Sequence, residues 1–171
     1  SFSCSSDDDS SSIQNPINRD IYTCGTESNG TYNIAKVWKN GIGTDLTDGT
    51  RNTIARSVFV SGNDVYVAGY EENSLSRSAK FWKNGVVTNL SDGSEFAYAY
   101  SITVSGSDVY VAGFESNGTV NVAKIWKNGT AINITDGTKS AIASCVLVNE
   151  ADVYVGGYET IGTKKVAKIW K

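Results

Sequence analysis

The stretch DVYVAGY at residues 64–70 has three counterparts elsewhere in the chain. It recurs as DVYVAGF at 108–114 and as DVYVGGY at 152–158, and a more divergent copy, DIYTCGT, occupies 20–26. Each copy begins 44 residues after the one before it, with no insertion or deletion between them. An ungapped match at a fixed spacing indicates that one structural unit has been duplicated in tandem.

The same spacing relates every tryptophan of the chain and a set of Asn-Gly pairs. The tryptophans are Trp38, Trp82, Trp126 and Trp170, and the Asn-Gly pairs are at 40–41, 84–85 and 128–129. We therefore divide the chain into repeats at 20–63, 64–107, 108–151 and 152–171, the last of which is incomplete.

One repeat length contains four predicted strands. Residues 57–61 and 65–70 are expected to form a hairpin around a Gly-Asn turn, because β-branched and aromatic residues flank it. Residues 79–83 form the third strand, and Asn84-Gly85 supplies the positive φ angles of a type I′ turn into a fourth strand at 86–90. A four-stranded meander in each repeat of about 40 to 45 residues is typical of a β-propeller blade.

The predicted second strand is apolar on both faces, since valines alternate with tyrosine and alanine along residues 65–70. Both faces must be covered, and blades packed around an axis cover them. A β-solenoid is the alternative, but solenoid repeats are usually about 20 to 30 residues long and lack a hairpin turn in each coil. The predicted fold class is therefore all-β, a β-propeller of 44-residue blades with about three and a half repeats present.

The two ends of the array do not complete a ring. Pro16 lies where the first strand of the first blade should be, and residues 170–171 fall within the third strand of the fourth repeat. Two explanations remain. The chain is part of a larger propeller of roughly five to eight blades, which we favour, or a second copy completes the partial blades by self-association.

Composition excludes several classes of function. The formal net charge is −3, so there is no basic surface signal for nucleic acid, and no stretch approaches the roughly 18 apolar residues of a membrane span. The chain has no histidine, which excludes Ser-His-Asp and Cys-His catalysis and histidine-ligated metal sites within it. We expect no cofactor and no metal.

Two stretches resemble repeats of known families. VFVSGNDVYVA at 58–68 resembles the first hairpin of an NHL-type propeller blade, and AKIWKNG at 123–129 is similar to the core of extracellular HAF-type repeats. The resemblance implies a propeller architecture outside the cytoplasm. It carries over no catalytic residue, because these families include binding proteins and enzymes alike.

Residues 1–19 differ in composition from the repeats and predict a disordered acidic Ser/Asp-rich tether. Cys4, followed by serines and aspartates, resembles the lipid-modified start of a Bacteroidetes-type surface lipoprotein, although Phe2 departs from the usual small residue. The resemblance implies lipidation of Cys4, an outer-membrane or cell-surface location, and membrane contact only through that anchor. A plain acidic linker is the alternative.

Residues that recur in every repeat are expected to serve the fold. Glu71 and Lys80 have equivalents in each unit and predict a cross-strand ion pair, since a catalytic pair would be unique. The four tryptophans are expected to pack in the core, with sugar stacking as the alternative. Cys24 and Cys145 lie outside the repeat pattern and are interpreted as buried small residues, which only a closed ring could bring together as a disulfide.

Residues that differ between repeats are the better candidates for ligand contacts, because binding sites usually lie on variable segments of a rigid scaffold. The candidates, which could also be surface drift, are Arg77, Glu95, Phe96, Tyr98 and Tyr100. The sequence thus favours a non-catalytic binding or scaffold propeller that recognises a glycan, peptide or partner protein. A purely structural repeat protein and a polysaccharide-acting enzyme are the alternatives.

Overall fold

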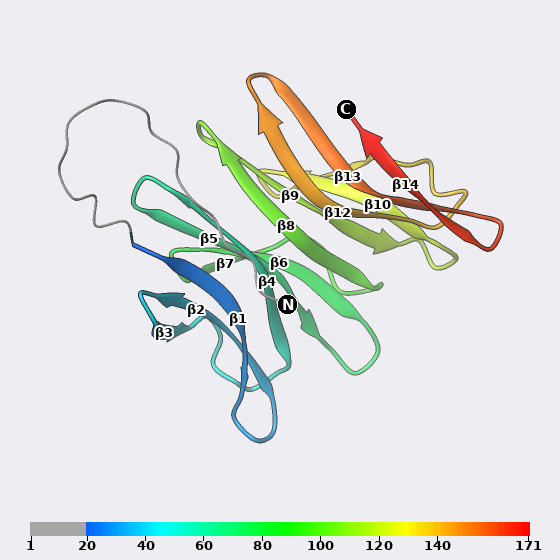
Figure 1. Cartoon of the computed structure of the whole chain (residues 1–171). Helices are drawn as coiled ribbons and strands as arrows, with labels where there is room; N and C mark the ends of the chain where they lie inside the picture. The colour runs from blue at the N-terminus through cyan, green and yellow to red at the C-terminus, as the bar shows by residue number, and fades with distance from the viewer. Residues whose placement is uncertain (1–19) are drawn as a thin grey trace.

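The computed structural model describes residues 20–171, and Figure 1 shows their arrangement. These residues form fourteen β-strands and, within that range, no helix, so the all-β prediction is confirmed. The expected tether at 1–19, with its Cys4, lies outside the described residues.

The strands form four antiparallel sheets in which each strand pairs with the next one along the chain. The first and fourth sheets have three strands each, and the second and third have four. Sheet by sheet, the strands are β1 (Tyr22–Ser28), β2 (Asn33–Lys39) and β3 (Ile42–Asp45); β4 (Thr53–Ser61), β5 (Asp64–Glu72), β6 (Arg77–Lys83) and β7 (Val86–Asn89); β8 (Ala97–Ser105), β9 (Asp108–Ser116), β10 (Asn121–Lys127) and β11 (Thr130–Asn133); β12 (Ala141–Asn149), β13 (Asp152–Ile161) and β14 (Lys164–Trp170).

The predicted Asn-Gly turns are present and do more than reverse the chain. Asn84 and Gly85 have φ angles of 50° and 82°, as a type I′ turn requires. The Asn84 side chain accepts a hydrogen bond from the Val65 backbone N–H at 2.8 Å and donates one to Asp64 at 2.7 Å. The turn between β6 and β7 is thereby tied to the start of β5, and the first and third sheets repeat the arrangement.

The first strands of the second, third and fourth sheets (β4, β8 and β12, here called the leading strands) each contain a β-bulge, and β4 is longer than predicted because its pairing continues beyond the bulge. In β4 the register with β5 shifts between Ala55 and Ser57, and β8 and β12 shift at the equivalent positions. Gly69 of β5 lies opposite the bulge, where a Cβ atom would come within 2.0 Å of the Ile54 carbonyl oxygen. Only glycine fits this close backbone approach.

Successive sheets pack face to face in chain order, as Figure 1 shows from β1–β3 to β12–β14. Buried apolar side chains fill each of the three interfaces. Side-chain hydroxyls also join neighbouring leading strands: Ser57 accepts a hydrogen bond from the Ile102 backbone N–H, and Ser101 accepts one from that of Val146, each at 3.2 Å. The sheets are therefore fixed to one another by polar contacts as well as by burial.

The interpretation of both cysteines as buried residues is wrong for one of them. Cys24 is buried in the first interface, whereas Cys145 is exposed on β12, and no disulfide joins the two. Cys145 occupies the position of Ser57 and Ser101, and in the fourth sheet this position lies on the face that no further described sheet covers. Cys145 is exposed because no described sheet covers this face of the fourth sheet.

Glu150 occupies an unfavourable backbone position. Its φ angle is 56°, close to the 58° and 59° of Gly62 and Gly106 at the equivalent turns of the two preceding sheets. A left-handed conformation costs a residue with a side chain roughly 1 to 2 kcal/mol, but costs glycine almost nothing.

We therefore predict that Glu150→Gly raises the free energy of unfolding by about 1 kcal/mol. Gly106→Glu is the matched control and should lower it by a similar amount, since nothing lies within 4 Å of a Cβ at Gly106 and only the backbone angle is tested. Urea unfolding followed by circular dichroism measures both. An unchanged midpoint for Glu150→Gly would show that the turn adopts another conformation in solution.

Candidate binding site

Four of the five predicted ligand-contact residues lie together where the second and third sheets meet. Arg77, on β6, forms an isolated bridge with Phe96, and its guanidinium carbon lies 5.4 Å from the Phe96 ring centroid and 5.5 Å from that of Tyr98. Arg77 also donates to Glu72 at 2.8 Å, which raises the pKa of the guanidinium. Its charge is therefore already neutralised.

Glu95 does not belong to this group. Its carboxylate lies 3.7 Å from the position that a Cβ of Gly118 would occupy, in the loop between β9 and β10. Glu95 thus faces the strand connection within its own sheet. The sequence placed it with Phe96 only because the two are adjacent in the chain.

Tyr98 is at the centre of a continuous group of rings. Its centroid lies 4.5 Å from that of Tyr70, 4.9 Å from that of Phe114 and 5.8 Å from that of Tyr100. Tyr70 and Phe114 are buried, whereas Tyr98 and Tyr100 are half-buried and remain accessible from one side. The buried rings hold the accessible ones in fixed positions.

Arg56 joins this group, although the sequence reasoning did not select it. Its Nη2 donates a hydrogen bond to the Tyr70 hydroxyl at 3.0 Å, and the guanidinium lies 5.4 Å from the Tyr70 ring centroid. The bulge in β4 falls on Arg56, and the same backbone position holds Tyr100 in β8 and Ser144 in β12. A comparison of the repeats at the bulge would have revealed it, because the backbone repeats there while the side chain changes.

These bulge residues open onto one hollow of about 320 Å³. Its lining comes from all three leading strands and from β13, through Arg56, Tyr100, Ile142, Ser144 and Tyr158. The volume is at the lower end of the range for small-ligand sites, and the lining combines apolar walls with a few polar groups, as such sites do.

The accessible tyrosines are protonated at neutral pH, as free tyrosine is, and burial raises their pKa further. Removal of water raises the pKa of the Tyr100 hydroxyl to about 12, and burial also raises the pKa of Tyr98. A phenol with a raised pKa stays protonated at neutral pH and can donate a hydrogen bond. The hollow therefore presents a cation and neutral hydroxyl donors.

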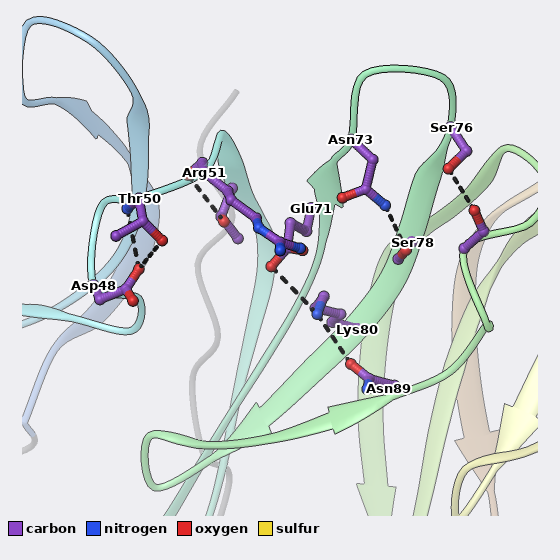
Figure 2. Close-up of polar contacts among 11 residues, drawn as sticks. Asp48, Thr50, Arg51, Glu71, Asn73, Ser76, Ser78, Lys80 and Asn89 are labelled. Carbon is purple, nitrogen blue, oxygen red and sulfur yellow. Dashed lines mark hydrogen bonds and ion pairs between the residues drawn. The ribbon is translucent and has the colours of Figure 1, made fainter.

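A second hollow of about 410 Å³ lies between the first two sheets and contains the repeated ion pair. Glu71 contacts Lys80 at 3.3 Å and Arg51 at 3.1 Å, and Lys80 also donates to Asn89 at 3.0 Å, a chain of contacts that Figure 2 shows. The equivalent Glu–Lys pair forms in all four repeats. Because the charges satisfy one another here, we assign this hollow no binding role.

The tryptophans differ according to their position in the stack. Trp82 and Trp126 are fully buried, each against the preceding sheet, whereas Trp38 and Trp170 are half-buried. Trp38 packs over Gly25 and Gly43 of its own sheet, on the face that no described sheet covers. The two buried rings are inaccessible to a sugar.

We predict that Trp126→Ala lowers the free energy of unfolding by about 3 to 5 kcal/mol, because it leaves a large cavity between the second and third sheets. Trp38→Ala, measured by urea unfolding at low protein concentration, should cost less than half as much because its ring is half-buried. Equal losses would mean that the outer face of the first sheet is covered as completely as the interior.

No protein-family model matches the chain, and a search of curated proteins finds no match. Among residues 20–171 there is no helix of the length and apolarity needed to cross a bilayer. The same residues contain no cluster of three or more His, Cys, Asp or Glu side chains that could hold a metal ion.

Proposed function

We propose that the four sheets are blades of a β-propeller that serves as a non-catalytic binding or scaffold module outside the cytoplasm. Its ligand would be a glycan, a peptide or a partner protein, held at the hollow between the leading strands. The acidic segment at 1–19, with lipid at Cys4, would attach the module to the cell surface or outer membrane, a proposal supported by the sequence resemblance alone.

The binding proposal rests on the three bulges, where the backbone conformation repeats but the side chain differs. Three identical register shifts present Arg56, Tyr100 and Ser144 from equivalent positions toward the same hollow. Residues needed for the fold, such as Gly69 opposite the bulge, are the same in all three sheets. Bulges often direct side chains at functional sites, and divergence at such a position supports a ligand contact rather than a structural role.

We predict that Tyr100→Ala weakens binding of the ligand that a glycan and peptide screen identifies, by about tenfold, because a ring contact worth roughly 1 to 2 kcal/mol is lost. Tyr32→Ala is the control, since Tyr32 is exposed on the first sheet, away from the hollow. Isothermal titration calorimetry measures both. Binding that survives Tyr100→Ala but is lost in Tyr32→Ala would place the site elsewhere, and a screen without any ligand would favour a structural repeat protein.

The outer faces of the stack support the propeller and suggest self-association. Phe81 and Ile125, which face the next sheet, are 7% and 8% exposed, whereas their equivalent Ile169 in the fourth sheet is 81% exposed. At the other end, Trp38 is half-buried where Trp82 and Trp126 are fully buried. Each outer face therefore resembles one side of the interior interfaces, and the two sides are complementary.

We propose that a second copy of the chain can cover these faces; in the longer propeller that the sequence favours, further blades would cover them instead. Two copies of the four described sheets supply eight, within the roughly four to eight blades of known propellers. The Trp38 face of one copy would cover the Ile169 face of the other.

We predict that light scattering on a size-exclusion column detects a dimer that persists on dilution. The Ile169→Asp variant should instead be a monomer. Val86→Asp is the control, since Val86 is also a highly exposed apolar residue and lies on the edge strand β7. A compact monomer at all concentrations would rule out closure between copies.

A further inference from the structure

The charge of Arg56 has no counter-charge in the described part of the chain. Two other arginines lie within residues 20–171, and each contacts a carboxylate: Arg51 with Glu71 and Arg77 with Glu72. Arg56 forms no ion pair with any described residue, and its Nε is buried without a hydrogen-bond partner there. The buried Nε is out of reach of a ligand, so a ligand could use the positive charge and the Nη donors that the bond to Tyr70 leaves over.

A second cation contacts one of the residues that line the hollow. The Lys165 ammonium is 4.5 Å from the ring centroid of Tyr158, which lines the hollow, and Lys165 also forms no ion pair with a described residue. No carboxylate lines the hollow. In a chain with a formal net charge of −3, this is a local concentration of unpaired positive charge.

The other lining groups favour a ring-shaped ligand with hydroxyl groups. Tyr100, Tyr158 and Ile142 provide flat and apolar walls, while the Tyr100 and Ser144 hydroxyls can donate or accept hydrogen bonds. Flat apolar faces suit pyranose rings, and hydroxyl groups suit their polar edges. A guanidinium binds a carboxylate through two charge-assisted hydrogen bonds, and a neutral sugar lacks that opposite charge.

We propose that the hollow between β4, β8 and β12 binds an acidic saccharide, with Arg56 contacting the carboxylate of a uronate residue and the charge of Lys165 adding longer-range attraction. Tyr100 and Tyr158 pack against the sugar ring, and Ser144 contacts its hydroxyl groups. This inference rests on the proposed binding function and specifies its ligand class.

The test compares an oligogalacturonide with a neutral oligogalactoside of the same length by isothermal titration calorimetry. The acidic chain should bind more tightly, and added salt should weaken only the acidic chain. Arg56→Gln should weaken acidic binding by about tenfold to a hundredfold, because a charge-assisted contact is lost. Arg51→Gln removes the same charge from a site outside the hollow and should change affinity less than about twofold.

Arg56 also donates a hydrogen bond to Tyr70, so Arg56→Gln could weaken the fold as well as the binding. Arg56→Lys is a second variant that keeps the positive charge. It should retain part of the acidic binding while losing the bidentate geometry. Thermal unfolding of each variant, followed by circular dichroism, checks that the sheets remain folded.

Three outcomes would overturn the inference. Equal weakening by Arg56→Gln and Arg51→Gln would indicate non-specific attraction, and an acidic peptide that binds as tightly as the oligogalacturonide would exclude a saccharide site. Neutral chains that bind equally well, insensitive to Arg56→Gln but lost in Tyr100→Ala, would overturn the acidic ligand and leave the proposed function standing. Absence of binding by any saccharide or peptide would overturn both.

Discussion

Burial of both faces of the inner sheets is the constraint on which the rest of this structure depends. A sheet of four short strands from a 44-residue repeat carries apolar side chains on both sides, so it buries all of them only between two neighbours. Phe81 and Trp82, adjacent on β6, illustrate this, since one packs toward the third sheet and the other toward the first. The stack follows from this alternation, and so does the incomplete burial of its two ends.

Close packing of the sheets also determines the local backbone. The leading strands approach one another closely enough for Ser57 and Ser101 to accept hydrogen bonds from backbone N–H groups of the next sheet. Each leading strand bulges at this point, and Gly69 and its equivalents leave space for the bulged carbonyl. The bulge turns one residue per sheet away from the strand pairing, and that residue is free to vary because no interface depends on it.

The sequence predicts the elements that local chemistry determines. The Asn84-Gly85 turn and the alternation along β5 specify hairpins and strand order, and both agree with the structure. The bulges could not be predicted, because they depend on a glycine in the neighbouring strand and on packing between sheets. Arg56 was missed for this reason, while Glu95 and Phe96, adjacent in the chain just before β8, have different surroundings in the structure.

Some residues of each repeat hold the fold and others do not, which explains how the repeats can keep one fold while the residue at the bulge diverges. Glu71 and Lys80 pair with each other, and the same pair recurs in all four repeats, so these charges are balanced within each repeat. At the bulge the backbone is fixed by glycine and by pairing on either side, so Arg56, Tyr100 and Ser144 can differ without loss of packing. Three different side chains then face one hollow from equivalent positions. An asymmetric ligand requires that kind of surface, and identical repeats alone cannot provide it.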